Sequence, residues 1–336
     1  MTIREQIEQM QAETLSEFAT LDQNSRGRDV EEPQCDIRPV FQRDRDRILH
    51  SKSFRRLKNK TQVFLDPQGD HYRTRMSHTL EVSQNARTIA KALRMNEDLV
   101  EAIALGHDLG HTPFGHCGER VLNRMSSEGF IHAEQSVRVV EKLEQEGRGL
   151  NLTWEVRDGM RNHRTSGHPA TPEGQIVRLA DKIAYINSDV DDAIRGKIMA
   201  EESLPKEIRN TLGTSVKARL DRLIHDVIIN STGSPEIRMS TEVDEAMKDL
   251  RSWLFTNVYT NPVAKGEETK ASRMIEELYR YYLENSNALP DRYRGMYMDE
   301  GEPLERVVCD YISGMTDSFA CKTFNEIFIP ISWEEY

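Results

Sequence analysis

Residues 103–119, IALGHDLGHTPFGHCGE, concentrate the side chains of this sequence that could do chemistry. Their ionisable groups are His107, Asp108, His111, His116 and Glu119. Imidazole and carboxylate groups together are the usual ligands of hard or borderline divalent metal ions. The stretch therefore suggests a metal site. The alternative is that a histidine at the end of an apolar helix face is simply a packed core residue, which is the more common case for a lone histidine.

The elements around this stretch would bring its side chains together. Asn96 can cap a helix whose apolar face includes Ile103, and His107 falls one turn later on that face. Glycines and a proline then end the helix. We therefore expect His111 and His116 on a turn that wraps round the same cavity.

Two further predicted helices carry polar groups toward this cavity. One covers about residues 77–93 and has His78 in its opening turn. The other covers about residues 174–194, and its apolar residues occupy nearly all faces, which is typical of a buried helix. Three polar side chains nevertheless follow one line along it, at i, i+4 and i+8: Asp181, Tyr185 and Asp189.

A carboxylate in a buried helix is costly unless it is paired or bound to a cation. For Asp181 the available partners are His78, His107 and Asp108. Two histidines and two aspartates can hold one divalent ion and leave positions open for water and a phosphate oxygen. The alternative is that Asp181 pairs with Arg178 or Lys182 on a half-exposed face.

His116 and Glu119 are separated by three residues, so a carboxylate lies one helical turn from an imidazole. This arrangement orients a general acid or base. Arg75 precedes His78 by the same spacing, so both can face the cavity.

The composition of the chain argues against a membrane-spanning or secreted protein. The chain has 336 residues, 30% of them charged, and no apolar run long enough to span a membrane. Its N-terminus lacks the apolar segment of a secretion signal, and its four cysteines have no CxxC spacing. We therefore predict a cytoplasmic protein with reduced thiols.

The net charge of −11 disfavours a general nucleic-acid coat protein. Residues 38–75 are locally basic, with eleven Lys/Arg against four Asp, which gives +7 there and −18 elsewhere. The segment can be a focused anion site, with phosphate as the natural ligand, or a solvated helical face with paired charges.

The remaining pattern is helical, and an all-α fold follows. Helices are predicted over residues 1–20, 41–58, 132–144, 152–163, 204–211, 215–229, 242–255, 269–283 and 303–319. A short β-favouring piece, residues 61–65, precedes a turn at residues 66–69, and residues 287–303 are predicted as a break.

The order His78, His107-Asp108, Asp181 resembles the signature of the HD superfamily of metal-dependent phosphohydrolases. Successive blocks resemble bacterial deoxyguanosinetriphosphate triphosphohydrolase-like proteins: RPVFQRDRDRILHSKSFRRLKNKTQVF, HDLGHTPFGHCGE, EGQIVRLADKIAYINSDVDDAI, LIHDVIINS and DYISGMTDSFA. The resemblance spans nearly the whole chain. It implies an HD-domain helical bundle with additional C-terminal helices, a single domain over residues 1–336 with its core at about 70–200 and an extension at about 201–336.

The resemblance also implies the reaction, which is hydrolysis of a dNTP at the α-phosphorus to deoxynucleoside and tripolyphosphate. The implied metal ligands are His78, His107, Asp108 and Asp181. His116 would be the catalytic imidazole that protonates the leaving 5′-oxygen, with Glu119 as its partner and His111 near the phosphates. The implied substrate contacts are Arg75, Lys182 and Tyr185 on phosphate with His132 close by, Gln62 and Val63 at the sugar, and Asp189 at the 3′-hydroxyl.

Several points stay open in the sequence. Another HD-type phosphodiesterase or nucleotidase, and a non-enzymatic nucleotide or nucleic-acid sensor, are the alternatives to a dNTP triphosphohydrolase. The preferred dNTP, activation by a dNTP or single-stranded DNA, and the choice among Mn, Mg, Fe, Ni and Zn cannot be read. A homo-oligomer, hexameric by resemblance, is expected. For Asp310, Tyr311 and Asp317 we expect a structural role.

Overall fold

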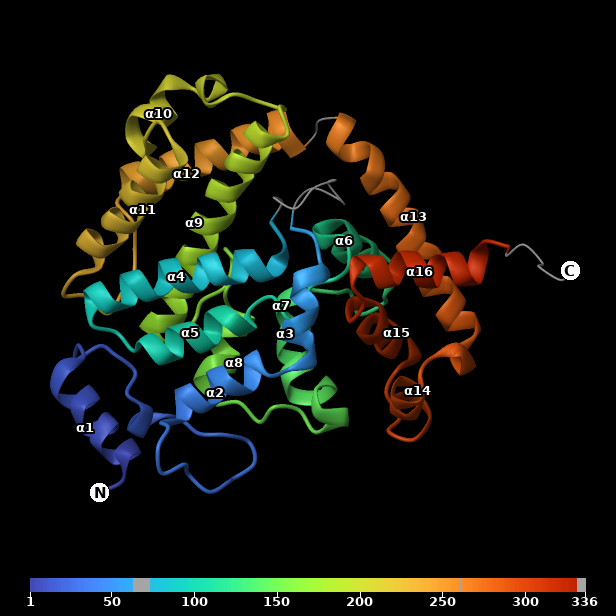
Figure 1. The fold of residues 1–336 in the computed structure, drawn as a ribbon, viewed down its shortest axis with the longest axis horizontal. Helices are drawn as coiled ribbons and strands as arrows, with labels where there is room; N and C mark the ends of the chain where they lie inside the picture. The colour runs from blue at the N-terminus through green and yellow to red at the C-terminus, as the bar shows by residue number, and fades with distance from the viewer. Residues whose placement is uncertain (63–72, 260–261, 331–336) are drawn as a thin grey trace, which may run out of the picture.

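The fold is a stack of helices in a computed structural model that describes residues 1–62, 73–259 and 262–330 (Figure 1). Within these ranges the structure has no β-strand, and extended backbone pairs only in one antiparallel bridge between Thr61 and Thr74. The prediction of an all-α fold is confirmed. The rest of the predicted β-favouring piece, residues 63–65, and the turn at 66–69 lie outside the described residues.

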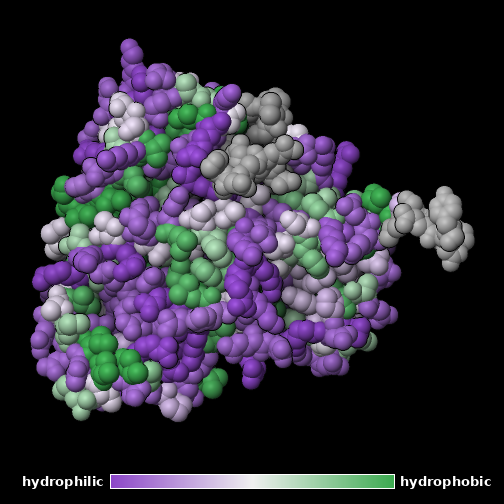
Figure 2. Space-filling view, viewed as in Figure 1, coloured by the Kyte–Doolittle hydropathy of each residue, from purple (hydrophilic) through white to green (hydrophobic). Residues whose placement is uncertain are grey.

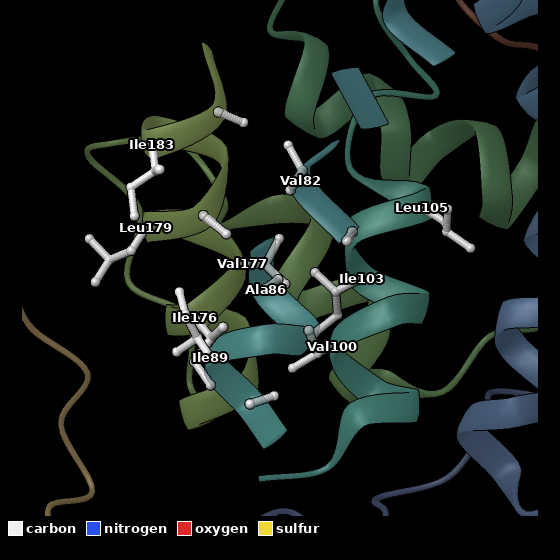
Figure 3. Packing of buried hydrophobic residues seen from close by; sticks show 14 of the residues in the cluster. Val82, Ala86, Ile89, Val100, Ile103, Leu105, Ile176, Val177, Leu179 and Ile183 are labelled. Carbon is white, nitrogen blue, oxygen red and sulfur yellow. The ribbon is translucent and has the colours of Figure 1, made fainter. Parts of the chain in front are cut away.

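Three central helices form the frame that positions the site: α4 (Arg75–Leu93), α5 (Glu97–Gly106) and α9 (Pro172–Arg195). Their apolar faces meet in one cluster, in which Val82, Ile103 and Val177 are fully buried (Figure 3). Each such side chain stabilises the fold by about 1.5–3 kcal/mol when it leaves water. The frame is therefore rigid where the polar side chains of these helices emerge.

Side-chain caps fix where these helices begin. Thr74 and Ser77 form a capping box at the start of α4, and the Asn96 side chain accepts from the N–H groups of Asp98 and Leu99 at the start of α5. Thr171 caps α9, whose first residue is proline. Since a cap satisfies backbone donors that a helix leaves open, these residues set the register of the functional side chains. The predicted cap at Asn96 is confirmed.

The N-terminal half surrounds this frame. Its helices are α1 (Ile3–Thr14), α2 (Val40–Leu49), α3 (Lys52–Arg56), α6 (Gly115–Met125), α7 (His132–Arg138) and α8 (Trp154–Arg161). The single helix predicted over residues 41–58 was wrong, because the Ser51 side chain caps a new helix by accepting from the N–H of Phe54. The helix predicted to begin at His132 is confirmed.

The C-terminal third forms two groups of helices on either side of the centre (Figure 1). The first group is α10 (Lys206–Leu212), α11 (Val216–Ser231) and α12 (Thr241–Leu254), which pack beside α9. The second is α13 (Pro262–Glu284), α14 (Asp291–Met298), α15 (Leu304–Ser313) and α16 (Asp317–Phe328), of which α13 packs on α6.

Two C-terminal predictions were wrong. Residues 287–303 contain helix α14, since Pro290 stands at the N-cap, where proline does not disturb a helix. The helix predicted over residues 303–319 is broken after Ser313, because Gly314 ends α15 and the Thr316 side chain caps α16 by accepting from the N–H of Phe319.

The buried apolar residues fall into two clusters. One runs from Phe41 to Val258 and contains the central frame, and the other joins α6 to α13, α15 and α16. The division into a core at about 70–200 and an extension stays a prediction. Figure 2 shows a face that is largely hydrophilic with small separate apolar patches. No helix among the described residues is both long and apolar enough to cross a membrane.

The basic segment at residues 38–75 largely pairs with carboxylates. Arg43 bonds Glu32 at 3.2 Å, and Arg45 bonds Asp98 at 3.1 Å. At its far end Arg73 bonds Asp192 at 2.7 Å. For the arginines on α2, these pairs favour the second interpretation of the basic segment, a helical face with paired charges, over an anion site.

Candidate active site

The four predicted metal ligands lie near one another between α4, α5 and α9, in two overlapping trios whose ligand atoms are within 4.8 Å of one another: His78, His107 and Asp108, and His107, His163 and Asp181. His78 Nε2 lies 3.0 Å from Asp181 Oδ1. His107, which follows α5, places its Nε2 3.8 Å from Asp181 Oδ1 and 3.8 Å from Asp108 Oδ1. The alternative partners of Asp181 are not used, since Lys182 instead bonds Asp244 at 3.1 Å.

The residues present fit a divalent cation. The His107 ring donates from Nδ1 to the carbonyl of Ala104 at 2.6 Å, so Nε2 carries the lone pair. That Nε2 is buried and has no hydrogen-bond partner among the described residues. A buried lone pair facing two carboxylates at 3.8 Å is the donor set of a bound divalent ion.

Arg75 is buried beside this group. Its guanidinium donates to Asp108 Oδ2 at 2.6 Å, while its Nε has no partner in the described chain. Burial alone would raise the pKa of Asp108, but the charge of Arg75 holds that pKa well below its usual value. The observed contact of Arg75 is therefore a carboxylate beside the metal-ligand candidates, and its predicted contact with phosphate stays a prediction.

A second group consists of His116, Glu119 and His132. The His116 Nδ1–H donates to Glu119 Oε2 at 2.9 Å, and the His132 ring and backbone N–H donate to Glu119 Oε1 at 2.8 and 3.0 Å. Burial opposes ionisation of Glu119, yet these hydrogen bonds hold its pKa far below the usual range. The ring of His116 is 65% exposed, so its Nε2 is accessible for proton transfer.

His111 lies between the two groups. Its ring stacks on that of His132 with a centroid distance of 4.6 Å, and lies 5.1 Å from that of His116. Both ring nitrogens are buried without a partner among the described residues. Burial, followed by the charge of Arg75, holds the pKa of His111 well below its usual value. His111 therefore places two buried ring nitrogens, without a partner among the described residues, between the two groups.

His163 belongs to the site and was not among the predicted residues. Its ring lies 4.9 Å from that of His107, and its Nε2 is 3.2 Å from Nε2 of His132. Burial, followed by the charges of these neighbours, lowers its pKa to about 3. The available signal was its place among the seven histidines between His71 and His163.

Apart from Arg75 on α4 and His132 on α7, the predicted substrate contacts that the structure describes lie along α9 and at residue 62. Gln62 Oε1 and Asp189 Oδ1 are buried without a partner in the described residues. Val63 lies outside the described residues. Burial raises the pKa of Tyr185 to about 12 and that of Asp189 to about 7. Tyr259, which no sequence pattern indicated, donates its hydroxyl proton to Asp189 Oδ2.

Close packing fixes the turn that joins the two groups. A Cβ at Gly110 would lie 2.2 Å from the backbone N of Ser136, so only glycine fits there. The Ser136 hydroxyl accepts from the N–H of Gly110 at 2.9 Å and donates to the carbonyl of His107 at 2.7 Å. Helix α7 thus holds both the metal-ligand candidate His107 and the start of the turn.

The C-terminal motif residues differ in their contacts. Asp310 is fully buried and accepts two hydrogen bonds from Nε and Nη2 of Arg138 at 2.8 and 2.7 Å, which ties α15 to α7. Tyr311 packs edge to face on Tyr282. These contacts agree with the expected structural role, whereas Asp317 contacts the turn at residues 111–115.

Comparisons with known proteins place these residues in context. The HD domain family model matches residues 75–186, and that of a phosphohydrolase-associated domain matches residues 237–326. Deoxyguanosinetriphosphate triphosphohydrolase-like proteins from Caldanaerobacter subterraneus subsp. tengcongensis and Clostridium perfringens (strain 13) are 56% and 50% identical to this chain. The alignments cover 100% and 98% of this chain and 98% of each relative. A solved structure of a hypothetical protein from Aquifex aeolicus aligns with 85% of this chain and 71% of its own, at 19% identity and a TM-score of 0.48.

Proposed function

Because the chain belongs to the family of deoxyguanosinetriphosphate triphosphohydrolase-like proteins and carries an HD domain, we propose that it hydrolyses dNTPs at the α-phosphorus. The products would be deoxynucleoside and tripolyphosphate. One observation carries the proposal: a donor set for a divalent ion lies beside an accessible imidazole that a carboxylate orients. The family and its domains make the chain a hydrolase.

His78, His107, Asp108 and Asp181 would hold one divalent cation. When bound, such a cation lowers the pKa of water and offsets the charge of a phosphate. The protein side chains would then act on the leaving group. His116 would donate a proton from Nε2 to the departing 5′-oxygen, because its Nδ1–H donates to Glu119 Oε2 at 2.9 Å and this bond orients the ring.

Arg75 and Lys182 would bind the triphosphate. Each now bonds a carboxylate, Asp108 at 2.6 Å and Asp244 at 3.1 Å. A phosphate oxygen competes well with a carboxylate for such donors. Tyr185, on the same line of α9, would add a neutral hydroxyl, since burial raises its pKa to about 12.

Gln62 and Asp189 would contact the deoxyribose of the substrate. Both present a buried acceptor oxygen without a partner among the described residues. A 3′-hydroxyl that donates its one proton to either oxygen would be favoured, because an unpaired buried acceptor costs about 1–3 kcal/mol. With Val63 against C2′, as the family resemblance implies, a ribonucleotide would meet a steric and desolvation penalty.

The test is to incubate the purified protein with Mn²⁺ or Mg²⁺ and each of the four dNTPs, singly and mixed, and to resolve the products by ion exchange. We expect deoxynucleoside and tripolyphosphate, and the mixtures show whether one dNTP activates hydrolysis of another. Monophosphate or inorganic phosphate as the primary product would instead support another HD-type phosphodiesterase or nucleotidase. No turnover in metal-loaded protein would favour a nucleotide or nucleic-acid sensor.

A paired variant tests the role of His116. His116→Ala should lower kcat by about 10²–10⁴-fold while the metal content, measured by mass spectrometry, stays at the wild-type level. His168→Ala is the matched control, since His168 is an exposed histidine outside the site. If His116→Ala loses metal and activity together, His116 is a ligand or a structural residue rather than the acid.

The oligomeric state also belongs to this proposal. We propose a homo-oligomer on the basis of the family, and light scattering coupled to gel filtration, with and without added dNTPs or single-stranded DNA, measures it.

A further inference from the structure

We propose that Asp317, more than a hundred residues beyond the HD domain match, is a positioning residue that fixes the turn carrying His116. The inference rests on the proposed function, because it assigns to Asp317 a role in the reaction of that same site. Its basis is the set of hydrogen bonds between the C-terminal motif DYISGMTD and the turn at residues 111–115.

The Asp317 carboxylate joins two segments of the active site. Its Oδ1 accepts from the backbone N–H of Phe114 at 2.9 Å. Its Oδ2 accepts from the backbone N–H and the hydroxyl of Thr61, at 2.9 and 2.8 Å. Thr61 precedes Gln62, the predicted sugar contact, and Phe114 lies two residues before His116. One carboxylate therefore holds a predicted substrate residue and the predicted acid in fixed relation.

The turn needs such an anchor. Phe114 has φ 59° and ψ 27°, a left-handed conformation that is unfavourable for any residue with a side chain. It is also the N-cap of α6, and its side chain makes no capping hydrogen bond. Strained backbone of this kind persists only where its surroundings hold it. The charged acceptor of Asp317, bound to the strained residue itself, supplies that hold.

Lys60 provides a second link between the C-terminal motif and the turn. The Lys60 side chain is buried, and its ammonium donates to the carbonyls of His111 and Ser313, the latter at 2.8 Å. The turn is thus fastened near both ends, at His111 through Lys60 and at Phe114 through Asp317. Ser313 and Asp317 stand on either side of the break between α15 and α16.

The variant Asp317→Asn tests the proposal. An amide keeps the shape of the carboxylate but replaces one acceptor oxygen by an NH₂ group, which cannot accept from Phe114 or Thr61. Glu302→Gln is the matched control, because Glu302 precedes α15 and pairs with Arg138 at 2.9 Å without contacting the turn. We expect Asp317→Asn to lower kcat by at least about tenfold, since misplacement of a catalytic group by about 1 Å can cost 10²-fold. Metal content should stay close to that of Glu302→Gln, because Asp317 contacts none of the proposed metal ligands.

The double variant Asp317→Asn/His116→Ala separates positioning from general stabilisation. If Asp317 acts through His116, the second substitution will change the residual activity of His116→Ala by less than about twofold, because the two effects are not additive. Multiplicative effects, or wild-type kcat in Asp317→Asn, would overturn the proposal.

Amide hydrogen exchange tests the same link without any turnover. Exchange in the peptide covering residues 111–118 should be faster in Asp317→Asn than in the wild type and unchanged in Glu302→Gln. Unchanged exchange in Asp317→Asn would overturn the inference. Absence of dNTP hydrolysis by the wild type would instead overturn the proposed function, so the two failures are distinguishable.

Discussion

Replacing Asp189 by Asn should stabilise the protein at neutral and alkaline pH while impairing its reaction. The Asp189 side chain is buried in α9, where Oδ2 accepts from the Tyr259 hydroxyl and Oδ1 has no partner in the described residues. Burial raises its pKa from 3.8 to about 7, against the effect of the Tyr259 hydrogen bond. Asn keeps the shape and the acceptor oxygen but carries no charge to desolvate.

The sign of the effect follows from proton binding. The unfolded chain ionises Asp189 near its ordinary pKa of 3.8, whereas the folded chain holds the proton up to about pH 7. Between these values the folded state binds more protons, so the free energy of unfolding falls as the pH rises, and the full cost is present above pH 7. A shift of one pKa unit corresponds to about 1.4 kcal/mol, so the cost is up to about 4 kcal/mol.

Urea unfolding of chelator-treated protein at several pH values between 5 and 8 measures this difference. Chelation matters because a divalent cation would add positive charge near Asp189. The stability gained by Asp189→Asn over the wild type should grow from pH 5 to about pH 7 and level off above it. The variant should also lose most dNTP turnover, since Asp189 is the proposed partner of the 3′-hydroxyl. Tyr259→Phe is the control, and it should lower the free energy of unfolding, because it removes a hydrogen bond to the Asp189 carboxylate. A difference between Asp189→Asn and the wild type that does not vary with pH would refute the reasoning.

Three further predictions test other parts of the site. Glu119→Gln should lower kcat by about 10–100-fold with metal content intact, because a hydrogen bond to a charged group contributes about 1.5–3 kcal/mol; loss of metal would contradict this. His107→Ala should abolish the increase in Tm on adding Mn²⁺, a linkage effect of ligand binding, and a retained increase would exclude His107 as a ligand. Gly110→Ala should reduce soluble yield and metal content together, because its Cβ would lie 2.2 Å from the N of Ser136; a fully folded, metal-loaded variant would contradict the packing argument.

Most of the helical frame could be predicted because its signals are local. The polar line of α9 and the cap at Asn96 depend on spacing within a single helix, and the structure places Asp181 against His78 at 3.0 Å. The errors came from local signals that compete. Ser51 and Thr316 each start a new helix inside an apolar pattern that runs on past them. The apolar periodicity of a segment does not show where a single side-chain oxygen accepts a hydrogen bond from a backbone N–H and so begins a new helix.

The contacts that complete the site could not be predicted in the same way. Tyr259 reaches Asp189 across 70 residues of sequence, and Asp317 reaches Thr61 across 256. Their residue types are ordinary, and their spacing carries no period. His163 could be predicted only in part. The clustering of histidines pointed to its region, but no periodic pattern around it indicated where its ring would lie.

The distribution of paired and unpaired groups shows what the site is built to receive. Burying a charged side chain costs desolvation free energy. In this site that cost is offset by pairing, as for Asp108 with Arg75 and Asp181 with His78. Several neutral or lone-pair atoms in the same region have none among the described residues: His107 Nε2, both nitrogens of His111, Gln62 Oε1 and Asp189 Oδ1. Each such atom costs about 1–3 kcal/mol while it is unsatisfied. A cation on His107 Nε2 and a hydrogen-bond donor on each of the two oxygens would remove that cost at three of these atoms, so satisfying them would contribute to the binding of metal and sugar in the proposed reaction.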